Sequence, residues 1–263
     1  MAIKIHGPKD FDSMRKAGKL AAQTLDFITD YVKPGITTSE INDLCHDFII
    51  KNNAIPAPLN YRGFPKSVCT SVNHVVCHGI PSEKKLKNGD IINIDVTVIV
   101  DGWHGDTSRM YHVGNVGIQA KRLTQVTYDS MMLAINMVRP GVRLGDIGFA
   151  IESYVKKFNY SSVRDYTGHG IGRVFHDEPT VLHYGKPGTG VELKEGMFFT
   201  IEPMINVGKA DTILSKFDNW TVTTRDKSLS AQFEHTIGVT SDGFEVFTSS
   251  PENFSCPPYD KTK

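Results

Sequence analysis

Two aspartates, Asp95 and Asp106, lie eleven residues apart on either side of a strongly β-forming stretch. Residues 96–100 are all β-branched, and the Asp101-Gly102 pair that follows them is typical of a tight hairpin turn. A hairpin would bring both carboxylates to one end of a two-stranded ribbon. Two buried like charges repel unless a cation compensates them, so this arrangement indicates a metal site. The alternative is that Asp106 caps a turn and Asp95 lies at an exposed strand end.

The helices that must position these acids follow from apolar spacing. Residues 10–32 carry apolar side chains at helical spacing, and Lys33-Pro34-Gly35 ends the pattern. A capping box at residues 37–40 begins a second helix. The same order of helix, Pro-Gly stop and helix recurs over residues 121–155, at an offset of 106. In the first helix of that repeat we expect Leu133 to face inward.

The strands repeat as well. Residues 193–202 echo residues 86–95 at an offset of 107, and the two segments end in the acids Glu202 and Asp95. Glu234 is a looser counterpart of the second aspartate, because each of these acids lies in strand-like sequence shortly before a threonine. A pseudo-two-fold axis would bring all four carboxylates together.

We therefore predict an α+β fold made of two similar halves, about 1–117 and 118–250. The two half-sheets would pair into one curved antiparallel sheet with the helices on its outer face. No Pro/Ser/Gly-rich linker divides the halves, so residues 1–250 are expected to form a single catalytic domain. Residues 251–263 are expected to form a flexible tail.

Four converging carboxylates require compensation. Two unit charges about 4 Å apart repel by about 4 kcal/mol at an effective dielectric near 20. Two divalent ions would balance four negative charges, which favours two metal ions over one. The remaining candidate ligand is a histidine, and three histidines lie in unusual settings. His169 has flanking glycines that would let the backbone approach a ligand closely, His78 precedes Gly79, and His176 follows Phe175. For each histidine the alternative is an ordinary turn residue. An oxygen-rich set with one imidazole suits Mn, Fe(II) or Co.

The overall composition excludes some classes of function. Lys plus Arg and Asp plus Glu both total 29, so nothing indicates nucleic acid or a membrane surface as a partner. No stretch approaches about 18 consecutive apolar residues, so no membrane span is expected. The four cysteines show no C-x-x-C spacing and no secretory signal is evident, so we expect reduced thiols in a cytoplasmic protein.

The candidate residues lie in blocks of sequence that resemble a known family. These blocks are residues 61–69, 73–81, 93–96, 104–108, 168–172, 199–203 and 230–236. They are similar to the type I methionine aminopeptidases of metallopeptidase family M24, in the short bacterial or organellar form. The resemblance runs over about residues 10–247 and implies the pita-bread fold. It also implies removal of the initiator methionine from nascent chains when the next residue is small.

The resemblance further implies a ligand set for two divalent metal ions, with Co, Mn, Fe(II) and Zn as candidates. Asp95 would bind one ion and His169 the other. Asp106 and Glu234 would bridge the two ions. Glu202 would bind the ion that carries the histidine and would act as the acid/base partner of the bridging water. A monovalent cation is also implied, at a site formed by Asn73, Val75 and Ser230.

Substrate contacts are implied in the same way. His78 and His176 would contact the scissile amide and stabilise the tetrahedral intermediate, where donors are needed as negative charge develops. The methionine pocket would be lined by Tyr61, Phe64, Cys69, Phe175 and Trp220 in addition to these two histidines. The alternative is that its aromatic residues belong to the core. The sequence departs from the family pattern at Pro58, where the family often has Cys, and at Phe64, where Tyr is common.

Two other functions remain open at this point. A Pro-specific aminopeptidase or dipeptidase of this fold would carry an extra amino-terminal domain, whereas about ten residues precede the first helix here. A non-catalytic binding module on this fold would have lost ligands, whereas all five are present. The expected partners are nascent polypeptides, with no membrane and no specific nucleic acid, and a monomer is expected. Transient ribosome docking is a further hypothesis, against an ordinary solvated surface, for the basic residues Lys209, Lys216, Arg225 and Lys227.

Overall fold

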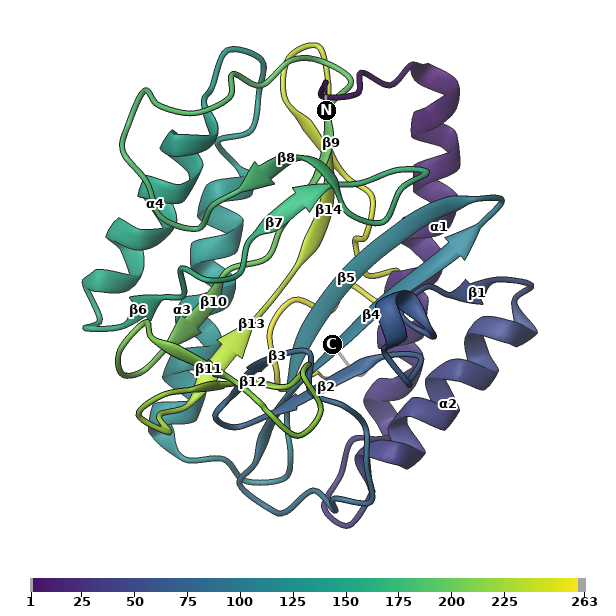
Figure 1. The fold of residues 1–263 in the computed structure, drawn as a ribbon, viewed down its shortest axis with the longest axis vertical. Coiled ribbons are helices and arrows are strands. Elements are labelled where there is room, and N and C mark those ends of the chain that lie inside the picture. The colour runs from purple at the N-terminus through teal and green to yellow at the C-terminus, as the bar shows by residue number, and fades with distance from the viewer. Residues whose placement is uncertain (1, 260–263) are drawn as a thin grey trace.

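The computed structural model describes residues 2–259. The helices α1 (Pro8–Ile28) and α2 (Thr38–Lys51) cover one side of a central group of strands, and α3 (Ile118–Ile135) and α4 (Leu144–Lys156) cover the other (Figure 1). None of the helices in the described range is both long and apolar enough to cross a membrane. The helices therefore repeat in pairs, as the sequence predicts.

Local sequence explains how the helices begin and which faces they bury. Thr37 caps α2, because its Oγ1 accepts the Glu40 N–H at 3.0 Å and the Glu40 carboxylate accepts the Thr37 N–H at 2.7 Å. In α3 the prediction for Leu133 was wrong, since this residue is 40% exposed. The buried stripe of α3 and the turn after it has the spacing i, i+3, i+4 and i+7, and it consists of Met131, Ala134, Ile135 and Val138.

The predicted hairpin forms, and its strands are the longest in the molecule as far as it is described. Strand β4 (Ile91–Val100) pairs with β5 (Trp103–His112) along its whole length. Asp101 and Gly102 both have positive φ, as a tight two-residue turn requires. The returning strand begins directly after the turn.

The register of this hairpin decides where the two aspartates point. Asp106 lies opposite Thr97, and Asp95 lies opposite Ser108. Because side chains alternate along a strand, both carboxylates point to the same face of the ribbon. They are diagonal neighbours in the middle of the ribbon rather than at its end, so this detail of the prediction was wrong.

The remaining strands are short. They are β1 (Ile55–Pro56), β2 (Cys69–Val72), β3 (Val75–Cys77), β6 (Ser161–Ser162), β7 (Gly168–Gly170), β8 (Asp177–Val181), β9 (Phe198–Ile201), β10 (Met204–Asn206), β11 (Thr212–Leu214), β12 (Val222–Thr224), β13 (Ser230–Gln232), β14 (His235–Val239) and β15 (Phe244–Val246). They form four small sheets in the orders β1-β4-β2 with β5 beside β4, β13-β10-β6, β11-β12-β3 and β15-β14-β9-β7-β8. Every pairing is antiparallel among the residues described.

The two halves meet where β5 reaches the junction of β13 and β14. The backbone of Glu234 forms an isolated antiparallel bridge with Ser108, whose carbonyl accepts the Glu234 N–H at 3.1 Å. The Thr107 hydroxyl donates to the Glu234 carbonyl at 2.7 Å. These contacts place an acid of the second half beside the strand that carries Asp106.

Each half has its own apolar core. One cluster lies entirely within residues 20–113 and includes Leu25, Ile41 and Ile94. The other lies mainly within residues 116–239 and includes Leu123, Ile147 and Phe199. The strands between these cores are therefore held from both sides, which positions the polar groups on their inner faces.

The carboxyl-terminal segment differs from the expected flexible tail as far as Tyr259. Its hydroxyl donates to the Met110 carbonyl at 2.8 Å, and its ring packs edge-on against Tyr111 at 5.3 Å. The Glu252 N–H donates to Asp26 at 3.3 Å. The sequence does not reveal these contacts because the segment lacks periodicity; residues 260–263 of the predicted tail lie outside the described residues.

Candidate metal centre and active-site cavity

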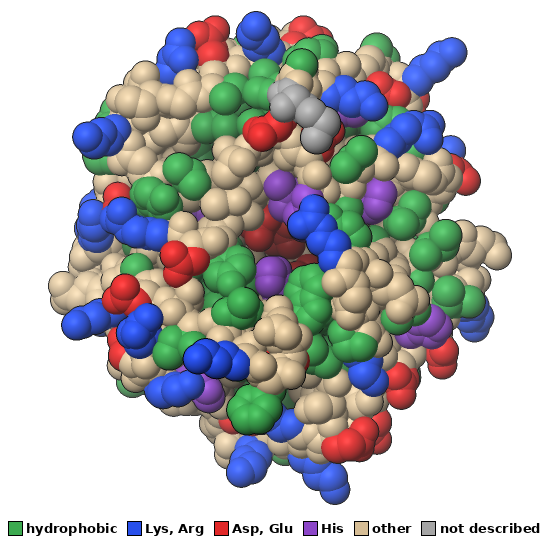
Figure 2. Space-filling view, viewed as in Figure 1, with side chains coloured by type: hydrophobic (Ala, Val, Ile, Leu, Met, Phe, Trp, Pro, Cys, Tyr) green, Lys and Arg blue, Asp and Glu red, His purple; other side chains and the backbone are tan. Residues whose placement is uncertain are grey.

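A cavity of about 330 Å³ opens between the two halves. In Figure 2 acidic side chains form the floor of a central hollow and histidines lie around it. The cavity is lined by every residue that the sequence analysis assigned to the divalent metal ions or to substrate: Tyr61, Phe64, Cys69, His78, Asp95, Asp106, His169, Phe175, His176, Glu202, Trp220 and Glu234. The fold therefore brings the whole predicted set together.

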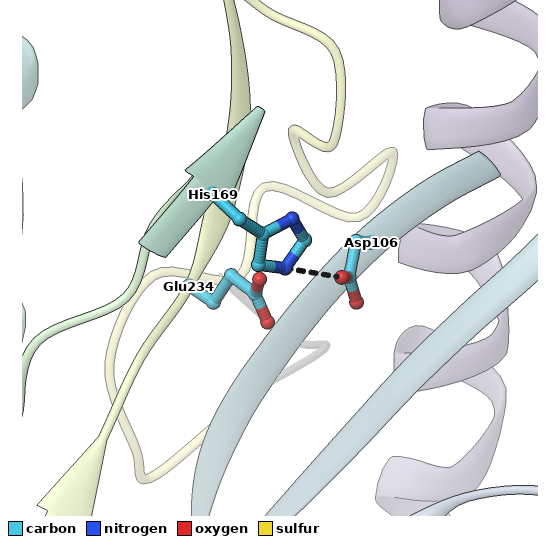
Figure 3. Close-up of side chains that lie close together, drawn as sticks. All are labelled: Asp106, His169 and Glu234. Carbon is cyan, nitrogen blue, oxygen red and sulfur yellow. Dashed lines mark ion pairs between the residues drawn. The ribbon is translucent and has the colours of Figure 1, made fainter. Parts of the chain in front are cut away.

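Three of the five predicted metal ligands form a compact group. Ligand atoms of Asp106, His169 and Glu234 all lie within 4.8 Å of one another. Figure 3 shows these side chains converging from β5, β7 and the junction of β13 and β14. His169 Nε2 lies 3.5 Å from Asp106 Oδ2 and 3.6 Å from Glu202 Oε1. Asp95 reaches the same cavity from β4.

The ring of His169 is oriented by its other nitrogen. Nδ1 lies 3.1 Å from the Gly170 carbonyl, to which it donates when it carries a proton. In that neutral tautomer Nε2 presents a lone pair to the acids, which is the arrangement of a metal-binding imidazole.

The glycines beside His169 are required by the packing of the neighbouring strands. A Cβ at position 168 would lie 2.4 Å from the Thr200 carbonyl oxygen, and one at position 170 would lie 2.0 Å from the Glu178 carbonyl oxygen. They let β7 pack between β9 and β8, and through this packing they place the histidine. The close approach of a ligand to this backbone stays a prediction.

Hydrogen bonds from neighbouring strands hold the acids. Thr97 Oγ1 donates to Asp106 at 2.6 Å, Thr200 Oγ1 donates to Glu202 at 2.8 Å, and Gln232 Nε2 donates to Glu202 at 3.2 Å. The sequence analysis missed all three donors. Each lies two residues from a predicted ligand, which in a strand means the same face, so the period-2 rule was a signal that could have found them.

His183 is a fourth missed residue, and no sequence pattern marks it. It is fully buried, and its Nε2 accepts the backbone N–H of Glu202 at 3.1 Å. Burial lowers the His183 pKa to about 3, so the ring is neutral at physiological pH. This contact fixes the backbone that carries the Glu202 carboxylate.

The acids repel one another in this buried setting. Burial, followed by the charges of Asp106 and Glu202, raises the pKa of Asp95 well above its ordinary range. Burial and the charges of the other three acids raise the Glu234 pKa in the same way. Burial raises the pKa of Glu202 to about 7, although nearby His169 opposes the rise. Without cations the cluster therefore retains protons.

The histidines divide into two groups. Burial alone would lower the His169 pKa, but the hydrogen bond that the protonated ring donates to Asp106 and the charges of Glu202 and Asp106 raise it overall. Burial lowers the pKa of His78 to about 4. The His176 pKa is lowered as well, chiefly by desolvation and then by the nearby His169. His78 and His176 are therefore neutral at physiological pH, and each offers one donor and one acceptor.

Aromatic rings also line the cavity. Phe64 packs edge-on against Trp220 at 5.2 Å, and Tyr61 lies 4.9 Å from Phe175. His78 has a φ of +55°, a left-handed conformation that residues other than glycine adopt rarely and often at functional sites. A Cβ at the next residue, Gly79, would lie 2.1 Å from the Thr70 carbonyl oxygen, so this glycine is required to place the histidine.

Similarity to known proteins decides the family. The model of metallopeptidase family M24 matches residues 12–241. The chain belongs to metallopeptidase family M24. A methionine aminopeptidase of Rickettsia prowazekii (strain Madrid E) is 74% identical over 259 residues, covering 98% of this chain and 100% of that relative.

Solved structures agree with this M24 assignment. The crystal structure of methionine aminopeptidase from Rickettsia prowazekii has a TM-score of 0.93 and 75% identity, covering 94% of this chain and 100% of that one. The prolidase from Pyrococcus horikoshii OT3 has a TM-score of 0.74 at 20% identity, covering 94% of this chain and 63% of that one, and shows the shared fold alone. The predicted resemblance to methionine aminopeptidases and the predicted α+β pita-bread fold are confirmed, and the prolidase alternative is not favoured.

Membership of a metallopeptidase family implies the use of divalent metal, and the cavity fits it. Its donor set is rich in carboxylate oxygens with one imidazole nitrogen, as hard or borderline divalent ions prefer. The raised pKa values of Asp95, Glu202 and Glu234 show that the buried carboxylates lack compensating charge. Divalent cations would replace the protons that the cluster otherwise retains.

Metal-free protein of this M24 chain is expected to lose stability between about pH 5 and pH 8, relative to a Glu202→Gln variant. The Glu202 pKa lies at about 7 in the folded state and is lower in the unfolded chain. Between the two values the folded state binds more protons, so stability falls as the pH rises. Thermal unfolding of both EDTA-treated proteins across this range measures the effect, and parallel curves for the two would contradict it.

Proposed function

We propose that this chain removes the amino-terminal methionine from nascent polypeptides whose second residue is small. One observation carries the proposal: a single cavity holds both a cluster of side chains that could bind metal and a set of apolar aromatic side chains. The cluster, with metal bound, can activate water and a carbonyl group. The aromatic side chains can bind a thioether side chain. The high identity to methionine aminopeptidases supports the same activity.

We assign two divalent ions to the cluster. Asp95 and His169 would each hold one of the ions, Glu202 would serve the ion held by His169, and Asp106 and Glu234 would be shared between the two ions. Four carboxylates and two divalent ions are neutral overall, which supports two ions over one. When bound, the ions supply Lewis acidity, which polarises a carbonyl and makes water nucleophilic near neutral pH. Co, Mn, Fe(II) and Zn are the candidates.

The chain's own residues then move protons and stabilise charge. Glu202 accepts a proton from the attacking water and passes it to the leaving amine, a role open to a carboxylate that lines the cavity beside the other acids. His78 and His176 are neutral and line the cavity, so each can donate an N–H to the substrate oxygen as negative charge develops.

The methionine side chain is assigned to the aromatic part of the cavity. Phe64 and Cys69 are buried there, and Tyr61, Phe175 and Trp220 complete the lining. Aromatic rings and sulfur provide the polarisable, apolar surroundings that a thioether prefers. Pro58 also lines the cavity, so the departure from the family pattern at this position remains apolar.

Peptide cleavage tests this assignment. Protein treated with EDTA and then titrated with Mn(II), Fe(II), Co(II) or Zn(II) is expected to release methionine from Met-Ala-Ser and to leave Ala-Pro-Ser intact. Faster cleavage of the Xaa-Pro peptide would favour a prolidase-like activity. No cleavage with any of the metals would favour a binding module.

Tyr61→Phe is expected to lower kcat by about two- to tenfold, which corresponds to one net hydrogen bond. The Tyr61 hydroxyl lies 3.0 Å from His176 Nδ1. By donating there it leaves the proton of the neutral ring on Nε2, where it can reach substrate. Steady-state kinetics with Met-Ala-Ser measure the change. Tyr184→Phe, at a tyrosine outside the cavity lining, is the matched control, and equal effects in both variants would exclude the tautomer role.

We also propose a monovalent-cation site at Asn73, Val75 and Ser230. The Ser230 hydroxyl is buried and has no hydrogen-bond partner among the described residues, which supports a further polar ligand there. Asn73 adopts a left-handed conformation and its carbonyl accepts the Ser230 N–H at 2.9 Å, so these backbones lie together.

The remaining proposals concern the setting of the reaction. All site residues lie in one chain, which supports a monomer, and its substrates are made in the cytoplasm. Transient docking to the ribosome is proposed for four exposed basic residues on and near β11 and β12: Lys209, Lys216, Arg225 and Lys227. Co-sedimentation with ribosomes that does not weaken with added salt would count against electrostatic docking.

A further inference from the structure

Arg62 is a cation at the mouth of the cavity that the proposed chemistry does not use. Its side chain lines the cavity, and the residue is exposed. Figure 2 shows a basic side chain bordering the central hollow. Within residues 2–259 its guanidinium makes no hydrogen bond or ion pair. It lies over the Tyr61 ring, with 5.3 Å between Cζ and the ring centroid. Its five N–H donors are therefore free for a ligand.

The backbone around Arg62 is fixed in an uncommon shape. Arg62 has φ +49° and ψ +29° within the short turn η2 (Tyr61–Gly63), and Asn60 before it is also left-handed. Three backbone hydrogen bonds close this loop: Asn60 N–H to the Phe64 carbonyl at 2.8 Å, Gly63 N–H to the Asn60 carbonyl at 3.3 Å and Phe64 N–H to the Tyr61 carbonyl at 2.9 Å. Left-handed conformations are costly for a residue with a Cβ and cluster at ligand sites. The loop thus holds its one cation at the cavity rim.

A series of ring contacts leads from the acidic cluster to this rim. The ring of His169 lies 4.2 Å from that of His176, which lies 5.2 Å from the Tyr61 ring. Arg62 then stacks on the outer side of the series, at 5.3 Å from Tyr61. An extended peptide advances about 3.3 Å per residue. The three steps span at most about 15 Å, so a chain cleaved at the cluster would pass Arg62 within about four residues of the scissile bond.

We infer that Arg62 binds a carboxylate on the third or fourth residue of the substrate, and so makes this enzyme favour nascent chains with Asp or Glu there. The inference rests on the proposed aminopeptidase function and deepens it. A guanidinium offers parallel donors that match a carboxylate, and stacking on an aromatic ring leaves its edge available. Arg62 is a specificity-determining residue and not a catalytic one, since it does not reach the acidic cluster.

The opposite charge at the rim lies on another element. Asp165 also lines the cavity, but its carboxylate already accepts the Thr212 hydroxyl at 2.6 Å. A basic third residue would meet Asp165, and an acidic one would meet Arg62. The rim therefore distinguishes substrates by the sign of their charge, and the two residues are expected to act in opposite directions.

The test compares four carboxy-amidated peptides, Met-Ala-Glu-Gly-Gly, Met-Ala-Gly-Glu-Gly, Met-Ala-Gln-Gly-Gly and Met-Ala-Lys-Gly-Gly, on metal-loaded protein. Amidation leaves the side chain as the only carboxylate, and the free acid of Met-Ala-Ser tests a terminal carboxylate separately. We expect at least one Glu peptide to exceed the Gln peptide in kcat/KM by about two- to fivefold, mainly through KM, as for an exposed ion pair. In Arg62→Gln the ratio should fall to about one.

Control variants separate the possible outcomes. Lys66→Gln removes a positive charge from the same segment but outside the cavity lining, and it should retain the wild-type ratio. Arg62→Lys keeps the charge without the planar donors and should give an intermediate ratio of kcat/KM. Asp165→Asn should lower kcat/KM for the Lys peptide only. An unchanged ratio in Arg62→Gln, with normal cleavage of the Gln peptide, would overturn this inference alone. Failure of wild-type protein to cleave any of the peptides would instead overturn the proposed function.

Discussion

Asp106→Asn is expected to lower kcat/KM by at least about 100-fold while the protein stays folded. Mutation of a residue that only orients a metal ligand typically lowers metal affinity or activity by about 10- to 100-fold. Asp106 is itself one of the three clustered candidate ligands, so a larger effect is expected. Asn has nearly the same shape and can still accept the Thr97 hydroxyl that now donates at 2.6 Å. The change therefore removes charge from the centre with little loss of packing.

Thermal unfolding with and without metal distinguishes loss of binding from loss of fold. A metal that binds only the folded state raises Tm, and the rise increases with the logarithm of the metal concentration relative to Kd. In Asp106→Asn this metal-dependent rise should largely disappear. Asp101→Asn is the matched control, because it makes the same change in the same hairpin, at an exposed turn position whose positive φ Asn tolerates. If Asp106→Asn kept near wild-type activity and the full metal-dependent rise, Asp106 would not belong to the metal centre.

The parts of the fold that the sequence predicts are those with strong local signals. The β-branched run before Asp101-Gly102 predicts the hairpin, and the Thr37–Glu40 capping box predicts where α2 begins. The register of the hairpin was less accessible, because the polar, glycine-containing start of β5 does not have the appearance of a strand. The two aspartates were therefore assigned to the end of the ribbon although they lie in its middle.

The candidate site was predicted through two kinds of information. The internal repeat pairs Asp95 with Glu202, and the family resemblance adds His169 and the pocket residues, all of which line the cavity. His183 illustrates what neither can supply. It contacts Glu202 only because the chain brings residues 19 positions apart together across β9, and no periodicity encodes such a contact. Arg62 was not predicted for a similar reason. Its proposed role depends on the left-handed backbone conformation that holds its side chain at the cavity rim.

Asp26→Asn is expected to lower the free energy of unfolding by about 3–5 kcal/mol. Asp26 on α1 pairs with Arg109 on β5, and the two residues are only 6% and 2% exposed. Arg109 Nη2 is already buried without a hydrogen-bond partner among the described residues, so the guanidinium depends on this one carboxylate. Asn keeps the shape but leaves a buried cation uncompensated. Urea denaturation measures the loss, which corresponds to a fall in Tm of roughly 6–20 °C for a chain of this size.

The same reasoning explains why this ion pair matters to the site. Asp26 also accepts the Ser250 hydroxyl at 2.7 Å, so it joins α1, β5 and the carboxyl-terminal segment. Glu245→Gln is the control, because it breaks the ion pair between Glu245 on β15 and Arg15 on α1, the helix that also carries Asp26. Both partners of that pair are partly exposed, and its loss should cost at most about 1 kcal/mol. Replacing both buried partners by apolar residues should cost less than Asp26→Asn, because no charge is then left buried. If Asp26→Asn were no worse than Glu245→Gln, water would have to reach Arg109, and β5 would be held to α1 by apolar packing alone.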